Sequence, residues 1–238
     1  MYYTIRLHEA EMLDLCEMIN KEATEDGQVW PPILGLYKSV VVALTCMRRN
    51  RVQAELADTY DVSQLTISRA ITGITPLVGK LLRKYVPTAD ELDDQQWYVV
   101  DGTLLPCWSW AGHPELYSGR HKTTGMNVRV ACTLDGDLAW ISDPIDGALP
   151  AEATDNWIGD KGYVDNDMIT PCKKPFCRNL ADWEKDYNTQ INKVRYVIER
   201  VIANFKTWRI MHTDYRRPLS TFTATISTVV SLHFYLTG

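Results

Sequence analysis

The first third of the chain is dominated by apolar residues that recur every three or four positions, which is the spacing of one face of a helix. Residues 8–21 show this spacing, with acidic side chains on the opposite face. Residues 33–47 follow a pair of prolines and are apolar enough for a buried helix. The pattern therefore predicts two helices before residue 50.

Residues 53–74 continue the helical spacing but are interrupted once. Val62 would place an apolar side chain in the turn between the two helices. Ser63 is a natural N-cap for the second helix, because its hydroxyl can accept a backbone N–H. Ile67 and Ile71 then fall on the face that would turn back into the core. Two helices joined by a tight turn are typical of a helix-turn-helix motif.

The start of the second helix in this motif would leave a set of polar side chains exposed. A recognition helix meets base edges and phosphates with such residues. The candidate DNA-binding residues are Gln64, Thr66, Ser68 and Arg69. An ordinary helical hairpin shows the same pattern, so the pattern by itself leaves both interpretations open.

The spacing of apolar residues changes from helical to alternating after an acidic segment, residues 88–96, which holds four acids and no base. Alternation and short apolar runs predict strands at 97–101, 127–133, 138–142, 157–160 and 168–170. Helical spacing returns from residue 180 to about residue 210. The pattern predicts an α/β chain with three parts: a helical domain at 1–87 that is the candidate DNA-binding domain, an acidic linker at 88–96 and a second domain at 97–238.

Composition narrows the function classes only a little. The chain has 238 residues, 45% of them hydrophobic, and can bury one good-sized core or two small ones. A formal charge of −5 argues against a uniformly basic nucleic-acid binder, yet residues 193–217 hold seven Lys or Arg against two acids. The six cysteines lack metal-ligand spacing, so reduced thiols are expected. The apolar run at 39–47 is far too short to span a bilayer.

Three acidic residues stand out because each has a different context. Asp101 ends the apolar run 97–100, Asp160 ends a second run at 156–159, and Glu199 lies inside a long helical pattern. Two carboxylates at the carboxyl ends of strands and one on a packed helix can converge, and converging carboxylates suit a pair of hard divalent cations. Taken singly, each has a simpler explanation: a turn acid, or half of an ion pair between the glutamate and the arginine four positions earlier.

Three motifs surround these acids, and together they are far more specific than any one alone. They are Val100-Asp101-Gly102-Thr103, Gly159-Asp160-Lys161-Gly162-Tyr163 and Arg195-x3-Glu199-x6-Lys206. With them the chain resembles, from about residue 41 to residue 238, the DDE-type transposases of bacterial insertion sequences, in the group related to the eukaryotic Harbinger elements. Two departures stand out. Asn192 occupies a position that is usually Tyr in the family, and the segment at 148–156 looks shortened by an internal deletion.

The resemblance implies a ribonuclease-H-like catalytic domain, which the order of the predicted strands and closing helix also fits. It implies that Asp101, Asp160 and Glu199 are the catalytic residues and the ligands of two Mg²⁺ or Mn²⁺ ions. The candidate contacts to DNA phosphates in this domain are Lys122, Lys161, Arg195 and Lys206, and Arg216-Arg217 could act likewise. Trp208 is expected in the core rather than on a base-stacking surface.

The function that the resemblance implies is DNA transposition. Such an enzyme nicks the terminal inverted repeats of its element and joins the freed 3′-hydroxyl to target DNA, as a homodimer or larger assembly. It would act in the cytoplasm, at the nucleoid, without a membrane partner. Two alternatives stay open: a non-catalytic, sequence-specific DNA-binding protein derived from a transposase, and a simple nuclease of the ribonuclease-H type. With the segment at 148–156 shortened, we expect it to be poorly ordered or irregular and to leave apolar surface near Leu149 and Trp157 exposed.

Overall fold

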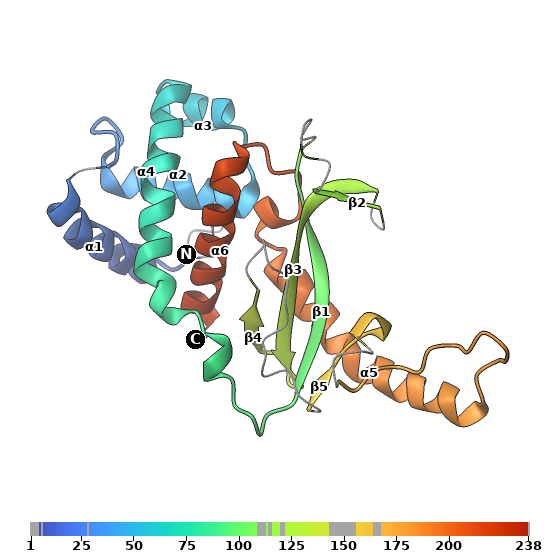
Figure 1. Cartoon of the computed structure of the whole chain (residues 1–238). Coiled ribbons are helices and arrows are strands. Elements are labelled where there is room, and N and C mark those ends of the chain that lie inside the picture. The colour runs from blue at the N-terminus through green and yellow to red at the C-terminus, as the bar shows by residue number, and fades with distance from the viewer. Residues whose placement is uncertain are drawn as a thin grey trace.

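The N-terminal part of the chain consists of four helices, as the apolar spacing predicts. In this computed structural model they are α1 (Glu9–Asp26), α2 (Gly35–Arg49), α3 (Gln53–Tyr60) and α4 (Gln64–Leu82). The structure describes residues 5, 7–27, 29–108, 113, 116–119, 122–142, 156–163 and 168–237. Figure 1 shows these four helices gathered on one side of the molecule and the sheet on the other.

Helices α3 and α4 are joined by a turn of three residues. Asp61 adopts a left-handed conformation (φ 51°) in this turn, and the Ser63 hydroxyl accepts the backbone N–H of Thr66 at 3.2 Å. Ile67 and Ile71 are fully buried, where they pack with residues of α2 and α3. The predicted N-cap and the predicted buried positions of this hairpin are therefore confirmed.

The second part of the chain contains a five-stranded sheet. Its strands are β1 (Tyr98–Pro106), β2 (Tyr117–Ser118), β3 (Thr123–Thr133), β4 (Leu138–Ile141) and β5 (Trp157–Ile158). β3 lies between β1 and β4 and is antiparallel to both, whereas β5 runs parallel to β1 on its other side. A parallel bridge between Ile158 and Ile169 extends the pairing by one more segment. The mixed α/β fold class is thus confirmed.

The first strand is longer than predicted, and this changes the position of Asp101. We expected the strand to end at Asp101, because Gly102 follows it. Instead β1 continues to Pro106, since Leu104 and Leu105 are buried and the whole strand pairs with β3. Asp101 therefore lies in the middle of β1, opposite Val130 of β3, and not at a strand end.

Two long helices complete the fold. They are α5 (Asp182–Phe205), which packs on β1 and β3, and α6 (Phe222–Thr237), which packs on α4. Short 3₁₀ helices lie at η1 (Arg83–Tyr85), η2 (Ala89–Glu91), η4 (Lys161–Tyr163), η5 (Arg209–Met211) and η6 (Leu219–Thr221). In Figure 1, α6 lies beside α4, although the two helices are far apart in sequence.

One hydrophobic core runs through both parts of the molecule. It contains residues of α1, α2 and α4 together with residues of β1, β3, α5 and α6. Trp208 is buried as expected (1% exposed), and the Arg48 guanidinium lies 4.6 Å from its ring centre. The boundaries proposed at residues 87 and 97 stay predictions, because the core is continuous across them.

One helical stretch, Leu219–Thr237, is long and apolar enough to cross a membrane by length and composition. In the protein, 56% of this stretch is buried, and α6 forms part of the core against α4. Packing inside the protein accounts for its composition.

The shortened segment lies almost wholly outside the described residues, as does Leu149. Trp157 is described, and our expectation of it was wrong. Its side chain is only 2% exposed, and its ring centre lies 5.2 Å from that of Tyr98. The indole is buried because it lies in β5, which pairs with β1, and packs into a cluster with Tyr163 and Met168.

Candidate active site

The pairing of β1 with β5 brings two of the predicted acids together. Tyr98 lies opposite Trp157 and Val99 opposite Ile158. Asp160 follows the end of β5 by two residues, and the charges of Asp101 and Asp160 both act on the Tyr163 phenol. Neighbouring strands are about 4.8 Å apart, and residues that match in parallel strands point to the same face. Although 59 positions separate them in sequence, both carboxylates lie near Tyr163.

Backbone amides hold the two carboxylates. Oδ1 of Asp101 accepts the N–H of Gly102 at 2.8 Å, and Oδ1 of Asp160 accepts the N–H of Gly162 at 2.7 Å. A Cβ on residue 162 would lie 2.9 Å from Oδ1 of Asp160, which is closer than real Cβ atoms come. The second glycine of the Gly-Asp-Lys-Gly-Tyr motif, Gly162, thus allows the backbone to approach the side chain of Asp160.

Tyr163 lies near both aspartates. Burial raises the pKa of its phenol; Arg129 opposes the rise, and the charges of Asp101 and Asp160 add to it. The Arg129 guanidinium lies 5.2 Å from the centre of the tyrosine ring. The carboxylates and this phenol are thus close enough to interact. The phenol stays protonated and can donate a hydrogen bond.

Arg195 of α5 provides the positive charge of the site. Its Nη2 lies 3.3 Å from Oδ2 of Asp101, and the two side chains are only 17% and 27% exposed. The Nε of Arg195 is buried without a hydrogen-bond partner among the described residues. The simpler alternative, a pair between Arg195 and Glu199, does not occur. The arginine turns instead toward the strand.

Glu199 is placed differently from the two aspartates. It lies on α5 one turn after Arg195, and its side chain is exposed. Within the described part of the chain, which includes all three acids, no group of three or more His, Cys, Asp or Glu side chains is arranged to hold a metal ion. The structure therefore places Asp101 and Asp160 near Tyr163, and the roles of all three acids as metal ligands stay predictions.

The two aspartates fit a hard divalent cation in their chemistry. Mg²⁺ prefers carboxylate oxygens, and it is usually held in proteins by one or two carboxylates together with water and substrate phosphates. In the structure, the charge next to Asp101 is that of Arg195. A cation at this position would therefore have to share the carboxylate with the guanidinium or displace it.

The predicted phosphate-binding lysines differ in how available they are. Nζ of Lys206 donates a hydrogen bond to the carbonyl of Leu104 at 3.1 Å, and burial lowers the pKa of this lysine. This bond ties the end of α5 to β1. Lys161 is exposed beside Asp160, and Lys122 is exposed with a left-handed backbone (φ 52°). Their contacts with DNA stay predictions.

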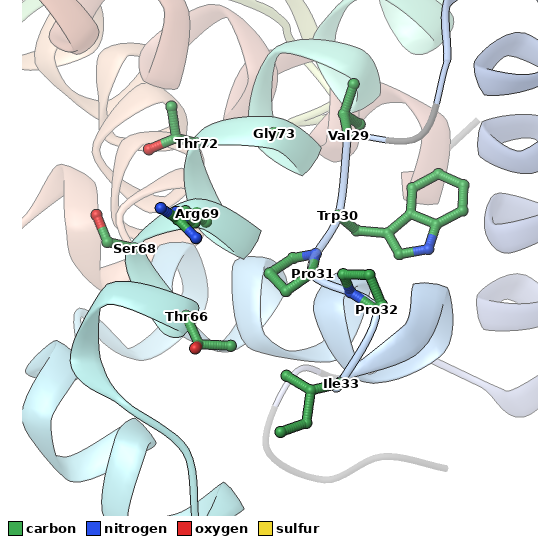
Figure 2. Close-up of a pocket in the computed structure, with 10 residues that line it drawn as sticks. All are labelled: Val29, Trp30, Pro31, Pro32, Ile33, Thr66, Ser68, Arg69, Thr72 and Gly73. Atoms are coloured by element: carbon green, nitrogen blue, oxygen red, sulfur yellow. The ribbon is translucent and has the colours of Figure 1, made fainter.

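Three of the four predicted recognition residues, Thr66, Ser68 and Arg69, line an open cavity of about 740 Å³. Figure 2 shows Thr66, Ser68 and Arg69 on α4 and, across from them, the segment from Val29 to Ile33. The hydroxyl of Thr66 lies 2.9 Å from that of Ser63, so it takes part in the helix cap. Gln64, Leu65 and Arg69 are exposed. These three side chains are the most accessible on this face.

Two residues of the site were not predicted from the sequence. Tyr163 stands in the motif around Asp160, so its position could have been read from that motif. Arg129 carries no such signal, because it is one polar position in the alternating strand β3. Its place under Tyr163 depends on the antiparallel register, in which it pairs with Gly102.

A mixed sheet with two adjacent aspartates, joined to a helical hairpin with a polar face, suggests an enzyme that acts on a phosphodiester. Comparison with known proteins identifies the class more closely. Residues 147–233 match the family model described as "DDE superfamily endonuclease". This match includes Asp160, Arg195, Glu199 and Lys206. It begins after β1, so it does not cover Asp101.

Two relatives carry transposase names. A protein of Streptomyces albus G, named as a transposase for insertion sequence element IS112, is 26% identical over 204 residues, which cover 80% of this chain and 75% of the relative. A protein of Microchaete diplosiphon, named as a transposase for insertion sequence element IS702, is 39% identical over 64 residues, 25% of this chain and 23% of the relative. No solved structure matches the chain. These findings confirm the resemblance: the chain is related to the DDE-type transposases of insertion sequences.

Proposed function

We propose that this chain is a DNA transposase that cuts at the ends of its element and joins those ends to target DNA. The observation that carries the proposal is that Asp101 of β1 and Asp160, which follows the neighbouring strand β5, both act on the Tyr163 phenol. The order β4-β3-β1-β5, with only β5 parallel to β1, supports a ribonuclease-H-like catalytic domain. The family match over residues 147–233 supports an endonuclease of the DDE type.

Asp101 and Asp160 would bind the divalent cations, and Glu199 would supply the third carboxylate. Two such ions, Mg²⁺ or Mn²⁺, would supply Lewis-acid stabilisation of the charge that develops on the phosphate oxygens. The amides of Gly102 and Gly162 hold one oxygen of each aspartate, which fixes the direction of the other oxygen. The chain thus orients its ligands before the substrate binds.

The proposed reaction has two steps that balance without a further reagent. In the first, a water oxygen forms a bond to phosphorus and the bond from phosphorus to the 3′-oxygen breaks, which leaves a 3′-hydroxyl. In the second, that hydroxyl oxygen bonds to a phosphorus of the target strand, and the target's own 3′-oxygen leaves with a proton. Both steps are in-line displacements, so one set of carboxylates can serve both.

The positive side chains around the acids would hold the DNA backbone. We propose that Arg195, Lys206, Lys161 and Lys122 contact phosphates. Arg195 is the central one, because its guanidinium already lies at the carboxylate. If a cation took over Asp101, this guanidinium would be free to bind a phosphate oxygen instead.

The hairpin of α3 and α4 would recognise the end sequence. A recognition helix lies in the major groove and reads base edges with residues near its N-terminus. Gln64 and Arg69 meet this requirement, since both are exposed near the start of α4. We further propose that two copies of the chain act together on double-stranded DNA, in the cytoplasm at the nucleoid.

Cleavage of a duplex that carries the inverted repeat flanking this element tests the proposal. The purified chain should nick this duplex with Mg²⁺ or Mn²⁺ and should not do so with a chelator present. Asp101→Asn and Asp160→Asn should bind the duplex and lose at least a hundredfold in cleavage rate, and Glu199→Gln should behave likewise. Asp90→Asn is the matched control, because Asp90 is an exposed acid in η2.

Each result discriminates between the proposals. Binding of the end duplex without any metal-dependent cleavage by the wild-type chain would favour the alternative, a DNA-binding protein derived from a transposase. Cleavage that ignores the end sequence would favour a simple nuclease. Full activity of Glu199→Gln, with both aspartate variants inactive, would remove the glutamate from the site and leave the two aspartates.

A further inference from the structure

Four arginines surround a second cavity, which none of the three acids lines. The cavity has a volume of about 460 Å³ and lies where the end of α2, the start of α3 and the segment after α5 meet. Its charged lining residues are Arg49, Arg51, Arg209 and Arg216, against one acid, Glu55. In a chain with a formal charge of −5, this is a concentrated positive surface.

The two halves of this cavity are held together by Asn50. This residue ends α2 in a left-handed conformation (φ 49°). Its side-chain amide donates to the hydroxyl of Thr213 at 2.7 Å and to the carbonyl of Asp214 at 3.1 Å. These bonds join the helical part of the chain to the segment that carries Arg209 and Arg216. The arginines are therefore positioned relative to one another by the fold.

The acid in the cavity does not cancel its positive charge. Glu55 pairs with Arg51 at 3.1 Å, but both side chains are more than half exposed, and exposed pairs of this kind are weak. Helix α3 also begins at this cavity, with Val52 as its N-cap and no side chain that caps its first turn. The positive end of the helix dipole thus adds to the arginine charges.

We propose that this cavity binds a backbone phosphate of the same DNA duplex that α4 reads. The inference rests on the proposed function, DNA binding through α3 and α4, and assigns it a second contact. In helix-turn-helix complexes the first helix crosses the DNA backbone while the second lies in the major groove. The start of α3 is where that backbone would pass. Arginine also suits phosphate, because its planar guanidinium binds two oxygens at once.

The cavity would also couple DNA reading to catalysis. Arg49 and Arg51 belong to the helical part of the chain, whereas Arg209 and Arg216 follow α5, the helix that carries Arg195 and Glu199. A phosphate held by both pairs would fix the duplex relative to the catalytic helix as well as to α4. The backbone contact would thus set which phosphodiester reaches the acids.

The salt dependence of DNA binding tests this site. The logarithm of the binding constant falls with the logarithm of salt concentration, with a slope of about −0.9 for each phosphate neutralised. The double variant Arg209→Gln/Arg216→Gln should lower the affinity for a random-sequence duplex of about 30 base pairs. It should also reduce the magnitude of the slope by about one, because the cavity binds one phosphate. Both side chains are exposed, so the melting temperature should not change.

The controls separate this site from general charge effects. Lys38→Gln/Lys84→Gln removes the same charge from exposed positions that do not line the cavity, and should leave the slope within about 0.5 of the wild type. Glu55→Gln removes the acid and should raise the affinity. Inorganic phosphate at millimolar concentration should compete only weakly, because the proposed occupant is the duplex.

The outcomes are distinguishable. If the wild type binds the duplex and the arginine variant keeps its slope, or loses no more than the lysine control, the cavity is not a backbone site. If inorganic phosphate competes strongly with the duplex for the cavity, the cavity is a site for a free anion and the inference is overturned. If the wild type binds no duplex even at low salt, the proposed function fails together with this site.

Discussion

Replacing Gly162 by alanine separates the position of Asp160 from the stability of the fold. The new Cβ would lie 2.9 Å from Oδ1 of Asp160, whereas an ordinary contact begins at 3.4 Å. The next nearest atoms are the carboxyl carbon and the other oxygen of the same aspartate, at 3.8 and 3.9 Å. The strain is therefore relieved by moving the carboxylate by about 0.5 Å, and the surrounding core does not have to move.

The two consequences differ in size. A displacement of 1 Å in a catalytic group can cost about a hundredfold in rate, so about 0.5 Å should cost roughly tenfold. Stability should hardly change: the lost hydrogen bond from the Gly162 amide is worth about 0.5–1.5 kcal/mol. Alanine restricts the unfolded chain more than glycine does, which raises the free energy of unfolding by about 0.4–1 kcal/mol. The melting temperature should therefore stay within about 4 °C of the wild type.

The assay is metal-dependent nicking of the end duplex, measured beside thermal unfolding. Gly119→Ala is the matched control, because nothing lies within 4 Å of a Cβ at this position. It should leave both measurements unchanged. If Gly162→Ala nicks the duplex as fast as the wild type, the orientation of Asp160 does not matter for the reaction. If its melting temperature falls by more than about 10 °C, the surrounding structure moves to accommodate the new Cβ, and the reasoning about a flexible carboxylate is wrong.

Three further predictions follow from other parts of the molecule. A Cβ on Gly79 would lie 2.6 Å from the Thr228 hydroxyl, so Gly79→Ala should force α4 and α6 apart and cost about 1–3 kcal/mol of unfolding free energy in denaturant titrations. Burial, aided by the charge of Arg48, lowers the pKa of His233 from 6.5 to about 4, so the unfolded chain binds the proton more readily. The contribution of His233 to the free energy of unfolding is complete above pH 6.5 and is lost as the pH drops toward 4. The free energy of unfolding should fall by about 2 kcal/mol between pH 7.5 and 5, and His233→Leu should remove this fall. Arg195→Gln removes the cation beside Asp101 and should tighten Mn²⁺ binding in calorimetry by about tenfold; an unchanged affinity would place the ion elsewhere.

The helical part of the chain was predictable because its signals are local. The spacing of apolar residues and the N-cap at Ser63 depend only on residues a few positions apart, and both are found in α3 and α4. The end of β1 was not predictable in this way. Gly102 looks like the end of a strand locally, but nine residue pairs with β3, from Tyr98 to Pro106, extend the strand beyond it.

The site shows the same limit at the level of single side chains. From helical spacing alone, the natural partner of Arg195 is Glu199, one turn away. The structure pairs Arg195 with Asp101, 94 positions earlier in sequence. That choice depends on how α5 packs across β1, which no local pattern encodes. The motifs could therefore indicate which residues belong to the site, but not which charges neutralise each other in it.

This pairing explains how the fold can carry adjacent carboxylates before any ion is bound. Two partly buried aspartates, one in β1 and one just after β5, repel each other, and this cost would fall on the folded state. The guanidinium of Arg195 compensates for one of these charges, and the amides of Gly102 and Gly162 stabilise both carboxylates through hydrogen bonds. Protein groups therefore offset part of the repulsion between the two aspartates. The affinity for a cation is correspondingly reduced, because the ion must compete with an arginine that is already in place, and phosphate oxygens of bound DNA become the natural new partner of that arginine.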